Sequence, residues 1–249
     1  MQMLGIDIGG SGVKGSIADL STGTLLHERH RIETPALLSP DEMAQAIADI
    51  ARFFEWNGPV GCGFPGVIMN GIARTAANID KRFIGFPVSD FFSQRLGQPV
   101  HIINDADAAG LGEATYGAGL NQQGTILLLT IGTGIGSAII LDGKLLPNTE
   151  LGHLKFKGDI AERYASDAAR KHADLSWKEW GLRFDEFLAH VYGLFYPDMI
   201  IVGGGTSKKF DKFAEFITTP CPVVPALLQN QAGIVGAALA ARHLVPASV

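Results

Sequence analysis

The chain has 249 residues, of which 47% are hydrophobic, and a formal net charge of −5 at pH 7. This length allows one large domain or two small ones, and the acidic balance gives no reason to expect nucleic acid or a membrane surface as a partner. No apolar run reaches the roughly 18 residues of a membrane span, and the chain enters a strand by residue 4 without a signal peptide. Its only cysteines, Cys62 and Cys221, are too few for a disulfide framework or a cysteine-rich zinc site, so we expect a reducing, cytoplasmic location.

The first predicted element is a strand at residues 4–8, which leads into a glycine-rich turn. The stretch GIDIGGSGVKGSI contains a G-x-G-x-x-G from Gly10 to Gly15. A dinucleotide site would need a helix after the third glycine, but a turn signal at 21–23 separates two short runs and predicts a hairpin. Asp7 lies between two isoleucines, where a carboxylate is costly without a cation or donors. The glycines therefore predict a phosphate-binding loop in a β-turn-β setting.

The rest of the first half alternates strands and helices. A helix start is predicted at Ser39, because Ser39 can cap, Pro40 suits the first turn and Glu42 completes a capping box. Apolar residues then recur at helical spacing as far as Phe54. The next predicted elements are a buried strand at 60–66, a β segment at 67–72, a short helix at 88–96, a strand at 100–104, a helix at 105–116 and a link at 117–124.

The second half restarts the same pattern. Residues 125–146 predict a strand, a glycine-rich turn and a second strand with a hairpin, as residues 3–27 do. Two such halves suggest an α/β fold of two lobes with a cleft between them. The predicted lobes are residues 1–117, joined by the C-terminal helix 233–249, and residues 118–232. Later elements are helical segments at about 159–173 and 176–195, a strand, glycine turn and helix start at 199–207, and a last helix from near Gly233.

Three glycine-rich turns carry the phosphate hypothesis: 9–15, 132–136 and 203–205. A single turn of this kind is more often plain turn geometry. Together they indicate a cradle for a nucleotide or a polyphosphate, because glycine lets backbone N–H groups approach phosphate oxygens closely. Ser11, Lys14 and Thr133 add hydroxyls or a cation. No G-x-x-x-x-G-K-[ST] occurs, so the chain has no P-loop.

Two polar groupings are candidate chemical sites. Asn104 and Asp105 lie where a predicted strand ends and a helix begins, so they are either helix caps or a general base facing a cleft. Glu150 and His153 bracket a Leu-Gly pair and come to one turn. They belong either to a solvated loop or to a site with the paired donors and acceptors that a polyhydroxyl ligand needs.

The motifs DIGGSGVKG, INDADAA, TIGTGIGSA, ELGH and VGGG resemble, in order and spacing, those of the ROK family of sugar kinases. The resemblance runs through essentially the whole chain and implies the two-lobed, duplicated actin/hexokinase-like (ribonuclease H-like) fold with a central cleft. Within the family, NTELGHL, LSWKEW, VGGGTSKKFDKF and PVVPALLQNQAGIVGAA resemble the polyphosphate glucokinases. This implies transfer of a phosphoryl group to the 6-hydroxyl of glucose, with Mg²⁺, with inorganic polyphosphate as the main donor and ATP as a second, by a homodimer.

The resemblance also assigns roles by position. Asp105 is the expected base that takes the proton from the sugar's 6-hydroxyl, and Asp7 is expected to orient Mg²⁺ through water. The residues expected to hold sugar hydroxyls are Asn78, Asn104, Glu150, His153 and Glu162. The residues expected at the phosphates and the donor end are Asp7, Gly9, Gly10, Ser11, Gly12, Lys14, Gly132, Thr133, Gly134, Gly203, Gly204, Gly205 and Lys208.

One segment departs from the family pattern. Many members have a Cys-x-Cys-Gly-x-x-Gly-Cys zinc segment between the Gly-His and the sugar-binding Glu, whereas residues 152–166 read GHLKFKGDIAERYAS without a cysteine. We therefore expect no zinc, and a sugar loop held by packing.

Two alternatives stay open. An ATP-dependent glucokinase is the enzyme alternative. A sugar-binding regulator is the non-enzyme one, disfavoured because the chain begins in the first kinase strand, without a helix-turn-helix domain. A long polyphosphate needs a basic track, for which the candidates are Lys208, Lys209, Lys212, Lys155, Lys157, Lys81 and Arg82, each of which by itself is more often a solvated surface residue.

Overall fold

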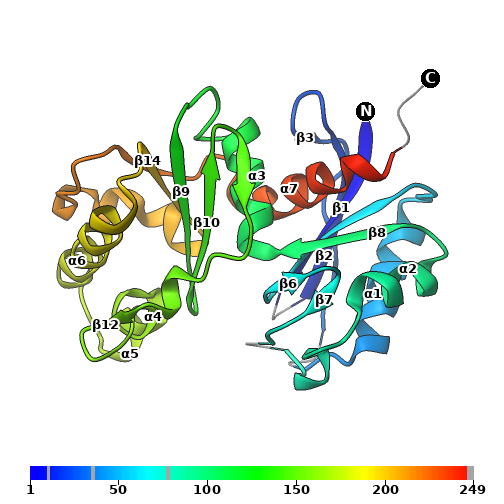
Figure 1. Cartoon of the computed structure of the whole chain (residues 1–249), viewed down its shortest axis with the longest axis horizontal. Helices are drawn as coiled ribbons and strands as arrows, with labels where there is room; N and C mark the ends of the chain where they lie inside the picture. The colour runs from blue at the N-terminus through cyan, green and yellow to red at the C-terminus, as the bar shows by residue number, and fades with distance from the viewer. Residues whose placement is uncertain (10–11, 35–36, 77–78, 246–249) are drawn as a thin grey trace. The chain divides into compact units, whose positions relative to one another are not determined.

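The computed structural model describes residues 1–9, 12–34, 37–76 and 79–245. The chain divides into two compact units (Figure 1): unit 1 is Met1–Gly112 with Gln231–Val249, and unit 2 is Glu113–Asn230. The boundaries predicted from the sequence come after residues 117 and 232.

Unit 1 contains a six-stranded sheet in the order β3-β2-β1-β5-β8, with β4 pairing β2. Strand β1 is antiparallel to β2 and parallel to β5, which is parallel to β8. The strands of the unit are β1 (Gln2–Gly9), β2 (Gly12–Asp19), β3 (Thr24–Leu25), β4 (His30–Ile32), β5 (Val60–Phe64), β6 (Ile68–Met69), β7 (Ile72–Ala73) and β8 (Val100–Asn104). Its helices are α1 (Pro40–Phe53), η1 (Lys81–Phe83), α2 (Val88–Leu96), α3 (Asp105–Tyr116, which continues into unit 2), α7 (Ala232–Ala240) and η6 (Ala241–Leu244).

The alternation of residues along β1 decides which helix covers which face of the sheet. Ile6 and Ile8 are fully buried in one core cluster with Ile47 and Ile50 of α1. The opposite face carries glycines where α7 crosses: a Cβ at Gly5 would lie 2.0 Å from the Ile234 carbonyl oxygen. Only a strand without side chains at this point lets the helix backbone approach so closely.

The local helix signals of unit 1 are confirmed. Ser39 Oγ accepts a hydrogen bond from the Glu42 backbone N–H at 3.2 Å, and Glu42 Oε2 accepts one from the Ser39 N–H at 2.8 Å, which is the predicted capping box. Helices α2 and α3 begin and end at the predicted residues.

Unit 2 repeats the pairing pattern of unit 1. Its sheet has the order β11-β10-β9-β14-β15, with β9 antiparallel to β10 and parallel to β14, as β1 is to β2 and β5. Its strands are β9 (Thr125–Ile131), β10 (Ile135–Leu141), β11 (Lys144–Leu146), β12 (Lys155–Phe156), β13 (Asp159–Ile160), β14 (Met199–Gly203) and β15 (Val223–Pro225). Its helices are η2 (Leu151–His153), α4 (Glu162–Ala165), α5 (Asp167–His172), α6 (Trp177–Phe195), η3 (Gly205–Lys212), η4 (Ala214–Phe216) and η5 (Gln229–Gln231). Helix α6 buries Trp180, Phe184 and Phe187 in one cluster with Leu127 and Leu129 of β9.

Three features of unit 2 differ from the sequence predictions. The helix predicted over 159–173 is wrong as one element, because Ser166 is extended (φ −74°, ψ 164°) and caps a new helix by accepting from the Ala169 N–H at 3.1 Å. The segment after β14 is a 3₁₀ helix interrupted at Lys209 (φ −117°, ψ 15°). Strand β15 was not predicted at all. Within the described part of the chain, no helix combines the length and the apolar character that a membrane span requires.

Candidate active site

The first glycine turn of unit 1 joins β1 to β2, and charged side chains flank it. Asp7 faces Lys14 across the two strands, with Lys14 Nζ 3.9 Å from Asp7 Oδ2, and about a quarter of each side chain is exposed. Burial raises the pKa of Asp7, while the positive charges of Lys14 and Arg29 lower it. The first turn of α7 is adjacent, since a Cβ at Gly233 would lie 3.3 Å from Asp7 Oδ1.

The described part of this turn is its two ends. Gly9 and Gly12 pair at the ends of β1 and β2. Gly10 and Ser11 of the predicted phosphate loop, and Asn78 of the predicted sugar site, lie outside the described residues.

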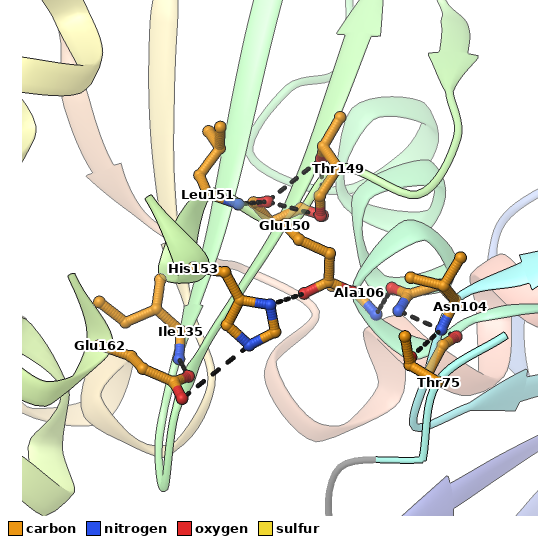
Figure 2. Close-up of polar contacts among 12 residues, drawn as sticks. Thr75, Asn104, Ala106, Ile135, Thr149, Glu150, Leu151, His153 and Glu162 are labelled. Carbon is orange, nitrogen blue, oxygen red and sulfur yellow. Dashed lines mark hydrogen bonds and ion pairs between the residues drawn. The ribbon is translucent and has the colours of Figure 1, made fainter. Parts of the chain in front are cut away.

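Asn104 is the last residue of the parallel strand β8, and Asp105 is the first residue of α3. Asn104 is 5% exposed, and its Oδ1 accepts from the backbone N–H groups of Ala106 at 2.8 Å (Figure 2) and Asp107 at 3.1 Å. Its Nδ2 donates to the Gly66 carbonyl at 3.2 Å. Asn104 therefore caps α3, which is one of the two readings of the sequence, and this cap fixes Asp105 as the first residue of the helix.

The predicted sugar-binding residues of unit 2 lie close together, with Glu150 and Glu162 on either side of the His153 imidazole. Figure 2 shows His153 between two carboxylates, with Nδ1 3.7 Å from Glu150 Oε2 and Nε2 4.0 Å from Glu162 Oε1. Burial raises the pKa of Glu150; His153 opposes that change and Glu162 adds to it. About half of the His153 side chain is exposed, so the grouping is open to a ligand.

The backbone that carries Glu150 and His153 is anchored to β10 by a serine that the sequence analysis missed. Ser137 is fully buried; its Oγ donates to the Thr149 carbonyl at 2.8 Å and accepts from the Leu151 N–H at 2.9 Å. Gly152 completes the close approach, because a Cβ there would lie 2.2 Å from the Ile135 carbonyl oxygen. A serine within the apolar run IGSAIIL was the available signal.

The second glycine turn is linked to Glu162. Glu162 Oε2 accepts a hydrogen bond from the Ile135 N–H at 3.2 Å. The same oxygen lies 2.3 Å from the position that a Cβ at Gly134 would take. A methyl group at Gly134 would therefore displace this carboxylate. No atom would lie within 4 Å of a Cβ at Gly132, and Thr133 is exposed.

The third glycine turn packs against the end of β9. Gly204 has a positive φ of 74°, and a Cβ there would lie 2.5 Å from the Ile131 carbonyl oxygen. Thr206 donates to the same carbonyl at 3.1 Å. Backbone packing explains Gly204 by itself. Gly203 ends β14, and Gly205 has open space around its Cα.

The segment without cysteines forms the β12–β13 hairpin. Phe156 packs on the Tyr164 ring, with centroids 5.5 Å apart, and Lys157 Nζ pairs with Glu186 Oε2 at 2.7 Å. Among the described residues, no three His, Cys, Asp or Glu side chains form a group that could hold a metal ion.

All seven cations of the predicted basic track are exposed. Three of them also have a partner within the protein: Lys157 pairs with Glu186 at 2.7 Å, Arg82 Nη2 lies 2.6 Å from Asp80 Oδ2, and Lys81 donates to the Ala76 carbonyl. The other four are Lys155, Lys208, Lys209 and Lys212.

Two sequence comparisons with known proteins match large parts of the chain. The sequence model of the ROK family matches residues 3–168. A polyphosphate glucokinase of Mycobacterium tuberculosis (strain CDC 1551 / Oshkosh) is 48% identical over 237 residues, which cover 95% of this chain and 89% of the relative.

Two solved structures are similar throughout. The inorganic polyphosphate/ATP-glucomannokinase from Arthrobacter sp. strain KM is 47% identical, with a TM-score of 0.93 and coverage of 98% of this chain and 99% of that chain. A ROK family glucokinase from Streptomyces griseus, in complex with glucose and AMPPNP, is 26% identical, with a TM-score of 0.82 and coverage of 98% and 100%. These likenesses confirm the predicted duplicated α/β fold.

Proposed function

The chain belongs to the ROK family, and from that premise we propose that it is a glucokinase. It transfers a phosphoryl group from inorganic polyphosphate to the 6-hydroxyl of glucose, giving glucose 6-phosphate, and uses ATP as a second donor. The similarity to polyphosphate glucokinases and to a polyphosphate/ATP-glucomannokinase supports both donors.

The observation that carries the proposal is His153 between Glu150 and Glu162. Glucose is neutral, so its affinity depends on directed hydrogen bonds. Two carboxylates accept from sugar hydroxyls, and an imidazole between them either donates or accepts according to its tautomer. Asn78 and Asn104 are further proposed sugar ligands; the Asn104 amide still has one N–H to donate once its cap and its bond to Gly66 are made.

Asp105 is the proposed general base. Phosphoryl transfer needs an in-line hydroxyl and an acceptor for its proton, and the carboxyl end of a parallel strand is a common position for such a group. Because the Asn104 cap fixes the start of α3, the Asp105 carboxylate is held on the first helical turn.

Asp7 is the proposed Mg²⁺ residue. A partly buried carboxylate fits a hard cation that keeps several waters and takes its other oxygens from phosphates. When bound there, Mg²⁺ neutralises charge on the phosphate oxygens. The proposed contacts to the donor are Gly9, Gly10, Ser11, Gly12, Lys14, Gly132, Thr133, Gly134, Gly203, Gly204, Gly205 and Lys208. A homodimer is expected from the family resemblance alone and a cytoplasmic location from the cysteine content, and both stay predictions.

The test compares glucose phosphorylation by the purified protein with polyphosphate and with ATP, each at low and high salt. We expect turnover with both donors and a steep loss with salt for polyphosphate, because several counterions are released when a polyanion binds, as with nucleic-acid backbones. Turnover with ATP alone would identify an ATP-dependent glucokinase. No glucose-dependent transfer from either donor would indicate a sugar-binding protein without kinase activity.

A further inference from the structure

A row of charged side chains crosses three strands of unit 1 beside the first glycine turn. Asp7 on β1 is the register partner of Lys14 on β2, and Lys14 is in turn the register partner of Arg31 on β4. Register partners point to the same face of a sheet. Three side chains, one from each of three neighbouring strands, therefore form one continuous row.

The other face of β4 explains why Arg31 is held in this row. His30 stacks on Phe53 of α1, with ring centroids 3.8 Å apart and an angle of 11° between the rings, and Ile32 packs on the core of unit 1. Because neighbouring residues of a strand alternate between faces, these two contacts direct Arg31 to the opposite face. Its guanidinium lies against the turn: Arg31 Nε is 3.2 Å from the position that a Cβ at Gly12 would take.

Three cationic side chains lie near this turn. Arg29 and Arg31 are both exposed, and a quarter of the Lys14 side chain is exposed. The two charged groups that act on the Asp7 carboxyl, Lys14 and Arg29, are both cations. Glu28 and Glu33 are exposed neighbours of these arginines in the chain, but neither is among the charged groups that act on Asp7. Lys14 and the two arginines thus bring cations to a turn whose glycines suit close approach of phosphate oxygens.

We infer that Arg29 and Arg31 extend the first glycine turn, at its Lys14, into a subsite for the phosphate chain of the donor. The inference rests on the proposed function and adds a donor-specific surface to it. A guanidinium binds a phosphate through two parallel N–H groups, and a lysine supplies a compact charge. A long polyphosphate has units left to occupy the subsite once its terminal phosphate is placed, so the subsite contributes more to polyphosphate than to ATP.

The experiment compares Arg31→Gln, Arg29→Gln and the double variant with the wild type. The donors are long-chain polyphosphate, tripolyphosphate and ATP, assayed between about 50 and 200 mM salt. We expect the double variant to raise KM for long-chain polyphosphate roughly tenfold or more, and to flatten the dependence of log kcat/KM on log salt by about 0.7–0.9 for each arginine, as for nucleic-acid phosphates. KM for glucose and kcat with ATP stay within about twofold.

Two controls separate charge from fold. Arg52→Gln removes an exposed arginine of the same unit, which pairs with Asp49 on α1, and is expected to change no donor parameter. Arg31→Lys keeps the charge and is expected to keep the salt dependence while losing part of the affinity. Unchanged polyphosphate KM and salt dependence in the double variant, or an equal rise in KM for all three donors, would overturn the inference with the proposed function intact.

A binding measurement tests the subsite even if the protein transfers no phosphate from polyphosphate. If the wild type transfers no phosphate from polyphosphate, titration calorimetry of long-chain polyphosphate against the wild type and the double variant decides the inference alone. Binding to the wild type that weakens roughly tenfold in the double variant supports the subsite. Equal binding, or none to the wild type, rejects it.

Discussion

At the scale of single residues, the neighbours Asn104 and Asp105 have different roles. Asn104 is buried, and two backbone N–H groups occupy its amide oxygen, so this oxygen caps α3 and only the amide N–H groups can serve another partner. Asp105, one position later, also accepts from the Ala106 N–H, at 2.8 Å, through one of its two carboxylate oxygens. A capping bond fixes the helix start, and the helix start fixes the candidate base.

Replacement of the candidate base tests its role directly. Asp105→Asn keeps size and hydrogen bonding, so we expect the fold and glucose binding to persist while kcat falls by roughly 10²–10⁴, the usual contribution of a positioned base. Steady-state kinetics and glucose titration measure the two effects. Asp174→Asn, an exposed aspartate in a turn, is the matched control. A kcat close to that of the wild type in Asp105→Asn would remove this residue from the mechanism.

Gly134 tests the link between the second glycine turn and the sugar cluster. In Gly134→Ala the new methyl displaces the Glu162 carboxylate from the Ile135 N–H. Because the displaced atoms end a flexible side chain, we expect the fold to survive and KM for glucose to rise roughly tenfold or more, since a hydrogen bond to a charged group contributes about 1.5–3 kcal/mol. Gly193→Ala, in open space on α6, is the control. A rise confined to KM for the phosphate donor would instead assign Gly134 to donor binding.

At the scale of elements, the end of the chain is packed on β8 through two histidines. The rings of His101 on β8 and His243 on η6 meet edge to face, with centroids 4.5 Å apart, and His243 Nδ1 lies 2.8 Å from the Ala240 carbonyl oxygen. Burial lowers the pKa of His101 to about 4, and the charge of His243 adds to this. The contact therefore depends on a neutral His101.

This depressed pKa predicts a pH dependence of stability. The unfolded chain binds a proton at His101 near pH 6.5, whereas the folded chain does not until about pH 4. The free energy of unfolding therefore falls as the pH decreases from 6.5 towards 4. Urea unfolding at pH 7.5 and at pH 5 measures the difference. We expect His101→Gln to reduce it and His172→Gln, an exposed histidine on α5, to leave it unchanged. The same pH difference in His101→Gln as in the wild type would contradict this assignment.

At the scale of the whole molecule, two units repeat one strand arrangement and differ in what surrounds it. In unit 2 the segment between His153 and Glu162 is closed by the β12–β13 hairpin, with Phe156 on Tyr164 and Lys157 paired with Glu186. Packing and an ion pair thus hold the segment that a zinc cage holds in the family pattern described above.

Metal content tests this replacement. Protein purified without added zinc is expected to contain no stoichiometric zinc by elemental analysis, while phosphoryl transfer requires Mg²⁺ and stops when it is removed with a chelator. Zinc is not expected because residues 152–166 contain no cysteine to bind it. One tightly bound zinc per chain would show that histidines and carboxylates form a site that the ligand pattern did not reveal.

The sequence by itself determined the features that depend on neighbours in the chain. The capping box at Ser39, the bounds of α2 and α3, and the strand–glycine turn–strand pattern that opens each unit follow from caps, periodicity and turn residues within a few positions. Asp105, Glu150 and His153 were singled out as polar groups in short motifs, and the family resemblance supplied Glu162 and the roles expected of all four.

Only the tertiary structure decided the features that join distant segments. The interruption at Ser166 ends a run whose composition suits a helix, and the short strand β15 exists through its pairing with β14. Ser137 supports the predicted sugar loop from another strand, the Glu162 carboxylate lies against Gly134, and β4 brings Arg31 to Gly12. Each of these depends on which backbone atoms meet after folding, and strand register and helix-to-sheet distance, which set those meetings, leave no local pattern in the sequence.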